Sequence, residues 1–206
     1  MTTTDDPAVP NHHAHYRTFS GFGGLIAALT MTVGRGDQAR LAARLCGLEP
    51  GDVVIDVGCG PGAAARNAAR VGAAVTGIDP APVMLQTARR LSFRTSGVRY
   101  LEGAAEALPL PDEMASVLWS IASVHHWPDV DGGLQEAHRV LGRGGRLVAI
   151  ERRVRPGAHG LASHGWTDEQ AAAFADRCLA NGFLAPHIER QTHGRKPSVA
   201  VLVTRS

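Results

Sequence analysis

Short apolar runs alternate with amphipathic stretches over most of the chain, a pattern that predicts strands alternating with helices. A first strand is predicted to start at Gly51, and later apolar runs predict strands at 74–78, 98–101, 114–120 and 145–151. The intervening and preceding stretches predict helices at 37–45, 63–71, 82–91 and 132–140. Strands and helices in this order are typical of a parallel sheet with helices on both faces.

The pattern changes after residue 151. A loop rich in Arg, Gly and His is predicted at 152–165, and Thr167 is predicted to N-cap a helix that runs to about Ala180. Apolar runs near 183–188 and 199–204 predict two final strands. Residues 1–15, rich in Thr, Asp, Pro and His, are expected to form a disordered arm. Residues 16–206 are expected to form one domain, because 206 residues that are 44% hydrophobic suit a single compact unit.

Composition narrows the class of protein. The net charge of +2 is too small to indicate nucleic acid or an anionic membrane as a partner. Cys46, Cys59 and Cys178 are odd in number and far apart, and no secretory signal accompanies them, so neither a disulfide framework nor a zinc site is expected. The longest apolar stretch, 22–33, is shorter than the roughly 20 residues of a membrane span. These features favour a cytoplasmic enzyme.

The first strand ends in a glycine-rich loop that suits a nucleoside ligand. Gly58, Gly60 and Gly62 are spaced two apart, and residues without a Cβ let the backbone come close to a ligand. Asp79 closes the next apolar run, about 20 residues on, where an acid can hydrogen-bond a ribose diol. The alternatives are a tight turn without a ligand and, for Asp79, a cap on the helix that starts near Pro82.

The glycine spacing indicates which nucleoside. The dinucleotide fingerprint is G-x-G-x-x-G, whereas this loop reads G-x-G-x-G with Pro61 between the last two glycines. Asp56, two residues before Gly58, is poorly placed beside a pyrophosphate but well placed to attract an ammonium group. S-adenosylmethionine carries an amine and no phosphate, so it is favoured over a nicotinamide cofactor.

With these motifs the chain resembles the class I S-adenosylmethionine-dependent methyltransferases, most closely the ubiquinone/menaquinone-biosynthesis-like small-molecule group. The segments that carry the resemblance lie at 53–62, 77–80 with Met84, 102–112, 124–129 and 136–147. The family fold is an α/β, three-layer, doubly wound Rossmann-like sheet, mostly parallel, with an antiparallel C-terminal hairpin whose last strand inserts inward. The resemblance implies the same fold here.

The resemblance also implies a set of residues that bind S-adenosylmethionine. These residues are Asp56, Gly58, Cys59, Gly60, Gly62, Asp79, Pro80, Met84, Ala104, Ala105, Glu106 and Ser120. Met84 would pack on the adenine ring, with ordinary core packing as the alternative. Relatives usually carry Asp where this chain has Ala104, and the lost hydrogen bond costs about 0.5–1.5 kcal/mol unless Glu106 compensates. Ser116, where relatives usually have an acid, is interpreted as a surface substitution.

His125 and His126 are the candidate catalytic residues, because the resemblance places them beside the transferred methyl group. Histidine can act as a general base near neutral pH, although in-line methyl transfer needs a base only for some acceptors. Adjacent residues rarely point the same way, so one of the pair, His125 by preference, is expected to face the substrate and the other to order the loop. His159 and His164 are secondary candidates.

The acceptor is expected to be a small hydrophobic or aromatic molecule. Residues that could form an apolar wall for it, or else plain core, are Tyr16, Phe19, Phe22, Leu25, Ile26, Leu29, Trp127 and Trp166. No metal is expected, because Asp129 and Asp131 have no third oxygen ligand near them in the sequence. The chain is expected to act as a monomer or a homodimer.

Two functions of other classes remain open. A nicotinamide-dependent reductase of the short-chain type would need a Tyr-x-x-x-Lys pair, and neither Tyr16 nor Tyr100 has Lys four residues later. A non-catalytic binding or partner subunit could have lost adenine recognition at Ala104. Retention of Asp56 and Asp79, together with all three loop glycines, favours the enzyme over this alternative.

Overall fold

The structure is a computed structural model that describes residues 35–191 and 197–206. Its strands are β1 (Val53–Val57), β2 (Ala74–Asp79), β3 (Val98–Glu102), β4 (Ala115–Ile121), β5 (Leu141–Arg152), β6 (Phe183–Gln191) and β7 (Ser198–Arg205). Its α-helices are α2 (Arg35–Leu45), α3 (Ala63–Val71), α4 (Pro82–Leu91), α5 (Val130–Val140) and α6 (Asp168–Ala180), with short 3-10 helices η1 (Val124–His126) and η2 (Gly160–Ser163). The expected arm at 1–15 lies outside the described residues.

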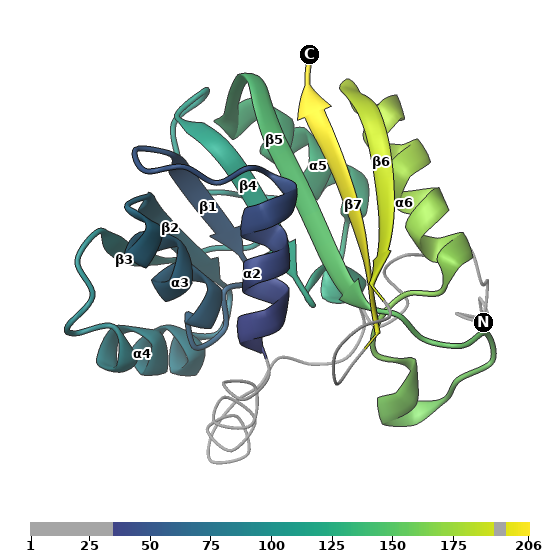
Figure 1. Cartoon of the computed structure of the whole chain (residues 1–206), viewed down its shortest axis with the longest axis horizontal. Coiled ribbons are helices and arrows are strands. Elements are labelled where there is room, and N and C mark those ends of the chain that lie inside the picture. The colour runs from purple at the N-terminus through teal and green to yellow at the C-terminus, as the bar shows by residue number, and fades with distance from the viewer. Residues whose placement is uncertain (1–34, 192–196) are drawn as a thin grey trace.

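All seven strands form one sheet, in the order β3-β2-β1-β4-β5-β7-β6 (Figure 1). The strands from β3 to β5 are parallel to their neighbours, whereas β7 is antiparallel to both β5 and β6. The last strand, β7, therefore lies between β5 and β6 in the sheet. This topology confirms the predicted doubly wound sheet with an antiparallel C-terminal hairpin.

Two hydrophobic cores lie on opposite faces of the sheet, because successive strand residues point to opposite sides. Val54 and Val117 pack in one core with residues of α2, α3 and α4, and their neighbours Ile55 and Leu118 pack in the other with residues of α5 and α6. Figure 1 shows these two groups of helices on the two sides of the sheet. Three layers result, as predicted.

The element bounds agree with the sequence pattern, with one marked difference. Thr167 caps α6 through a capping box, in which its side chain accepts from the Gln170 N–H and the Gln170 side chain accepts from the Thr167 N–H. The start of β5 was wrong, because the strand begins at Leu141, directly after α5, and not at residue 145. The pairing between β4 and β5 shifts register after Ala115, which accommodates the extra residues around Gly144.

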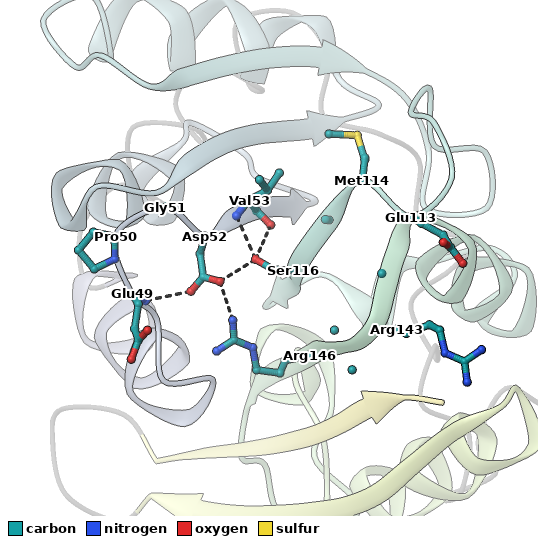
Figure 2. Close-up of a pocket in the computed structure, with 14 residues that line it drawn as sticks. Glu49, Pro50, Gly51, Asp52, Val53, Glu113, Met114, Ser116, Arg143 and Arg146 are labelled. Atoms are coloured by element: carbon teal, nitrogen blue, oxygen red, sulfur yellow. Dashed lines mark hydrogen bonds and ion pairs between the residues drawn. The ribbon is translucent and has the colours of Figure 1, made fainter.

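A polar pocket of about 600 Å³ lies at the end of the sheet where strands β1 and β4 begin (Figure 2). Within it, Ser116 Oγ donates to Asp52 Oδ1 at 2.6 Å and accepts from the Val53 N–H at 3.0 Å. Arg146 Nη2 lies 2.6 Å from Asp52 Oδ1. Ser116 is half-buried and joins β1 to β4, so the interpretation of Ser116 as a surface substitution was wrong.

The charge of Asp52 is stabilised in this network. Partial burial raises its pKa, but hydrogen bonds from Ser116 and from the Glu49 N–H, together with the Arg146 guanidinium, outweigh burial and hold the pKa below the ordinary 3.8. A carboxyl whose pKa is lower in the folded state stabilises the fold above its unfolded pKa, and this contribution is lost as the pH falls through the folded pKa.

We therefore predict that Asp52→Asn lowers the free energy of unfolding by about 1–2 kcal/mol at neutral pH, because it removes the charged acceptor of Ser116 and Arg146. The difference should shrink as the pH falls below about 4. Urea unfolding at pH 7 and at low pH measures it, with exposed Glu49→Gln as the matched control. A difference that is equal at both pH values would contradict the role of the charge.

Candidate functional site

The predicted cofactor residues gather at the opposite edge of the sheet, where the parallel strands end. Val57, the last residue of β1, pairs with Ile78 of β2 and with Ser120 of β4, and Asp79 pairs with Glu102 of β3. The loops that follow these four strands therefore start side by side. Ligands of open α/β sheets bind at this edge, outside the carboxyl ends of the strands.

The glycine loop takes a path that requires glycine. Gly58, Gly60 and Gly62 have φ of +70°, +52° and +75°, in the left-handed region. A Cβ on Gly58 would lie 1.9 Å from Ser123 Oγ, and one on Gly62 would lie 2.2 Å from the Tyr100 hydroxyl. The loop therefore packs against neighbouring strand ends without room for a side chain at these two positions.

Asp79 connects the end of β2 to this loop. Its Oδ2 accepts from the Gly60 N–H at 2.8 Å, and its Oδ1 accepts from the Ala81 N–H at 2.9 Å. The N-cap of α4 is Ala81, so Asp79 is not the helix cap that the alternative interpretation required. A carboxylate can accept about four hydrogen bonds, so the same group can hold the loop and a ribose diol.

Three further cofactor candidates flank Asp79 and the loop. Asp56, in the middle of β1, is 1% exposed and lies in register with Gly77. The Cys59 thiol is buried, and it donates to the Gly60 carbonyl at 3.6 Å, so only its backbone is placed to meet a ligand. Pro80 follows Asp79 directly and is exposed.

The segment after β3 carries a buried hydrogen-bond acceptor two residues after Ala104. Ala104 is half-buried, and its carbonyl accepts from the Ala107 N–H at 3.2 Å, while Ala105 packs in the core. Glu106 Oε2 is buried and has no hydrogen-bond partner among the described residues. A buried carboxylate oxygen without a partner suits a donor from a bound ligand, such as an exocyclic amine.

Met84 lies in α4, which follows β2, and Ser120 lies in β4, on the other side of β1 in the sheet order. Met84, in the first turn of α4, is 2% exposed and packs with Ala81 and Val83 in a small cluster apart from both main cores. Ser120, near the end of β4, is fully buried, and its Oγ has no hydrogen-bond partner within 35–191 and 197–206. Buried polar atoms of this kind are rare unless a ligand or water pairs with them.

The expected aromatic wall is not formed by the two tryptophans. Trp127 is 4% exposed, and its Nε1 donates to Ser123 Oγ at 3.3 Å. Trp166 is fully buried, with its ring centroid 4.9 Å from that of Phe174. Both side chains belong to the core on the α5 and α6 side, so the alternative of plain core packing holds for them. The other six residues of the expected wall lie outside the described residues.

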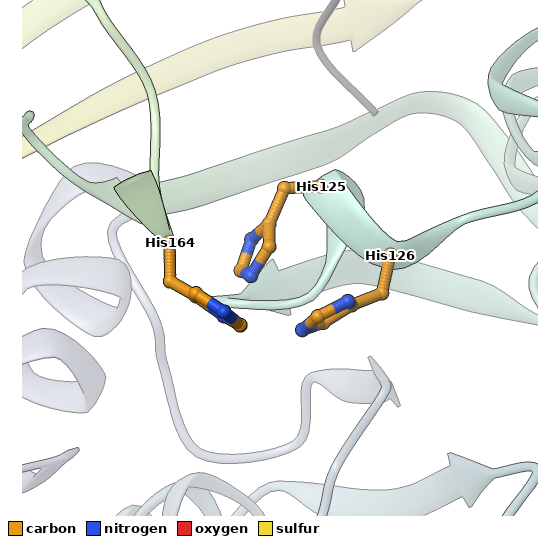
Figure 3. Close-up of side chains that lie close together, drawn as sticks. All are labelled: His125, His126 and His164. Atoms are coloured by element: carbon orange, nitrogen blue, oxygen red, sulfur yellow. The ribbon is translucent and has the colours of Figure 1, made fainter. Parts of the chain in front are cut away.

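His125 is held by a buried carboxylate that sequence reasoning missed. Its Nδ1 lies 2.8 Å from Glu151 Oε2, and Glu151, in β5, is fully buried. The rings of His126 and His164 lie beside it, with centroids 4.0 Å and 5.6 Å from that of His125 (Figure 3). His159 is exposed and lies outside this group. Glu151 could have been found, because it ends the predicted strand next to β4.

We predict that Gly58→Ala lowers the free energy of unfolding by about 2–4 kcal/mol, through overlap with Ser123 and left-handed backbone strain. In a Ser123→Gly background the overlap is removed, since the nearest remaining Ser123 atom would lie 3.9 Å away, so the cost should fall to about 1–2 kcal/mol of strain. Gly144→Ala, with φ of +72° and no atom within 4 Å, is the control for strain alone. Chemical denaturation measures all four variants, and an equal cost of Gly58→Ala in both backgrounds would contradict the predicted overlap.

Comparisons with known proteins agree with this geometry. Residues 55–149 match a family model described as a methyltransferase domain. The demethylmenaquinone methyltransferase of Tropheryma whipplei is 40% identical over 112 residues, which cover 54% of this chain and 46% of that protein. The 27-O-demethylrifamycin SV methyltransferase of Amycolatopsis mediterranei is 35% identical over 129 residues, which cover 59% and 47%. The chain thus spans about half the length of the curated relatives it matches.

Solved structures match more of the chain at lower identity. A SAM-dependent methyltransferase from Aquifex aeolicus is 16% identical, covers 88% of this chain and 98% of its own, and has a TM-score of 0.75. This likeness supports the fold. Residues 55–149 thus match a methyltransferase domain, and the fold is similar to that of a solved SAM-dependent methyltransferase.

Proposed function

We propose that the protein transfers a methyl group from S-adenosylmethionine to a small hydrophobic or aromatic molecule. The main support for this proposal is the hydrogen bond from the Gly60 N–H to Asp79, which holds a carboxylate next to a glycine loop at the strand ends. The match of residues 55–149 to a methyltransferase domain supports it, and so do the names of two relatives, a demethylmenaquinone methyltransferase and a 27-O-demethylrifamycin SV methyltransferase.

Each part of the cofactor has a candidate partner. Asp79 would hold the ribose diol, and Glu106 Oε2 would accept from the adenine amino group in place of the Asp that Ala104 lacks. Asp56 would attract the ammonium group, directly or through water, and the buried Ser120 Oγ would meet the methionine end. When bound, S-adenosylmethionine supplies a methyl group activated by a sulfonium leaving group.

The protein's contribution to the reaction is to orient the acceptor, exclude water and, for a hydroxyl acceptor, remove a proton. Glu151 Oε2, 2.8 Å from Nδ1 of His125, would fix the tautomer in which Nδ1 carries the proton and Nε2 is the basic nitrogen. His125 and Glu151 would thereby prepare an acceptor oxygen for the methyl group that bound S-adenosylmethionine would supply. Glu151 is a positioning residue in this scheme. His126, half-buried next to His125, lines the same space.

The cysteines bear on the cellular location of the protein. Cys46, Cys59 and Cys178 are all buried free thiols, and burial raises the pKa of Cys46 to about 11. Unpaired cysteines are typical of reducing compartments, which supports a cytoplasmic location. Every helix within 35–191 and 197–206 is too short or too polar to cross a bilayer. We propose a monomer or a homodimer.

A non-catalytic binding subunit is the second candidate, because Ala104 cannot accept from adenine. Glu106 weighs against it, since its buried Oε2 places an acceptor two residues away. The chain therefore retains a means to recognise the base. Under this alternative the glycine loop and Asp79 would have no ligand to hold.

We predict that Glu106→Ala weakens binding of S-adenosylhomocysteine by about three- to tenfold, because it removes one hydrogen bond worth about 0.5–1.5 kcal/mol, and that adding Ala104→Asp to this variant restores the affinity. Calorimetric titration of the wild-type chain and the two variants measures this. Ala107→Asp, at an exposed position in the same turn, is the matched control for the added carboxylate and should leave the affinity of Glu106→Ala unchanged. Absence of binding by both the wild-type chain and the double variant would contradict the proposed cofactor.

A further inference from the structure

We infer that His125, His126 and His164 form a binding site for a divalent metal ion of the zinc type. One imidazole nitrogen from each residue can be chosen so that all three lie within 4.8 Å of one another. The ring centroids of His126 and His164 are 5.5 Å apart, and Figure 3 shows the three rings turned toward a common space. Two of the ligands come from η1 and the third from the residue after η2.

The ligand set matches zinc chemistry. Neutral imidazole is a preferred ligand of zinc and of neighbouring first-row ions, and three histidines with an open fourth position are a known catalytic zinc arrangement. With metal–nitrogen distances of about 2.0–2.1 Å, tetrahedral ligand nitrogens lie about 3.3 Å apart. The nitrogens must therefore approach by at most about 1.5 Å, which ring rotations of the half-buried His126 and His164 can supply.

Glu151 provides the support that such a site needs. Metal-binding histidines usually donate their second ring N–H to a carboxylate, which fixes the tautomer. Glu151 Oε2 takes this position at 2.8 Å from Nδ1 of His125, so Nε2 is the nitrogen directed to the metal. Glu151 is fully buried, and a buried carboxylate is costly without a positive charge nearby. A divalent ion on His125 would supply that charge.

The backbone around His164 is fixed against β5, so its place in the cluster is built into the fold. Arg152 Nε donates to the His164 carbonyl at 2.9 Å. The next residue, Gly165, has φ of +141°, and a Cβ there would lie 2.0 Å from the Arg152 carbonyl oxygen. The Trp166 N–H donates to that same oxygen at 2.8 Å. Only glycine permits this approach, which brings His164 to the end of the strand that carries Glu151.

Metal binding goes beyond the proposed methyl transfer and does not depend on it. A consequence for the reaction does rest on the proposed function. The fourth ligand position would take water or an oxygen of the acceptor, and a metal-bound hydroxyl would lose its proton to solvent more readily. In that state Nε2 of His125 is a metal ligand and not the base, so the metal-loaded and metal-free proteins would activate the acceptor differently.

The test is titration of the full chain, first stripped with a chelator, with Zn²⁺ by calorimetry and with Co²⁺ by absorption spectroscopy. One ion per chain and a tetrahedral Co²⁺ spectrum are expected. His164→Ala and His126→Ala should each weaken binding at least about tenfold, and Glu151→Gln by about 10- to 100-fold. His159→Ala, at an exposed histidine of the same loop, should leave the affinity unchanged.

A competing site is present in the sequence, since His12, His13 and His15 lie close together near the amino terminus. The variant with all three changed to Ala should keep the ion. Absence of stoichiometric binding, binding unchanged in His164→Ala, or loss in the amino-terminal variant would each overturn the proposal. Binding of S-adenosylhomocysteine is measured on the same variants, and its persistence in His164→Ala separates failure of the metal site from failure of the cofactor proposal.

Discussion

The hydrogen bond from the Gly60 N–H to the Asp79 carboxylate is the contact on which the geometry of the site depends. Gly60 is the middle glycine of the loop after β1, and Asp79 is the last residue of β2. The second oxygen of the same carboxylate accepts from the Ala81 N–H, just before α4. One side chain thus fixes the exits of two neighbouring strands and the start of a helix relative to one another.

This hydrogen bond forms only because the glycine loop can pass between neighbouring side chains that leave no room for a Cβ. Gly58 packs against Ser123, in the segment after β4, and Gly62 packs against Tyr100 of β3. The loop after β1 therefore packs against side chains of β3 and of the segment after β4, and it is hydrogen-bonded to the last residue of β2. The nearby polar groups, Glu106 and Ser120, each keep a buried oxygen without a partner in the described part of the chain. A preorganised ligand site requires both a rigid backbone and polar atoms that are placed to bind the ligand.

The fold could be predicted from the sequence because the spacing of apolar residues distinguishes most of its helices from its strands. The bounds of α3 and α4 and the inward insertion of β7 were predicted correctly, and they follow from local patterns and from the family resemblance. The start of β5 was missed because the shift in its pairing with β4 depends on contacts between strands. Period alone does not reveal such a shift.

The site was predicted only where its residues are close in sequence. The glycine loop and Asp79 form a recognisable spacing, whereas the pairing of His125 with Glu151 joins residues 26 positions apart. The approach of His164 depends on Gly165 and Arg152, and no spacing rule connects them to His125. Trp127 and Trp166 were candidates for the acceptor wall because composition cannot separate a buried indole from one that lines a site.

The function proposed for this protein requires that Asp79 and the glycine loop bind S-adenosylmethionine. Calorimetric titration with S-adenosylhomocysteine, with NAD as a control ligand, tests it most directly. We expect micromolar binding to the wild-type chain and a loss of affinity of about 10- to 100-fold in Asp79→Ala. Glu102→Ala, which removes the exposed acid paired with Asp79 on β3, should bind as the wild type does. Equal affinity in Asp79→Ala and Glu102→Ala, with both proteins folded, would show that Asp79 does not hold the cofactor.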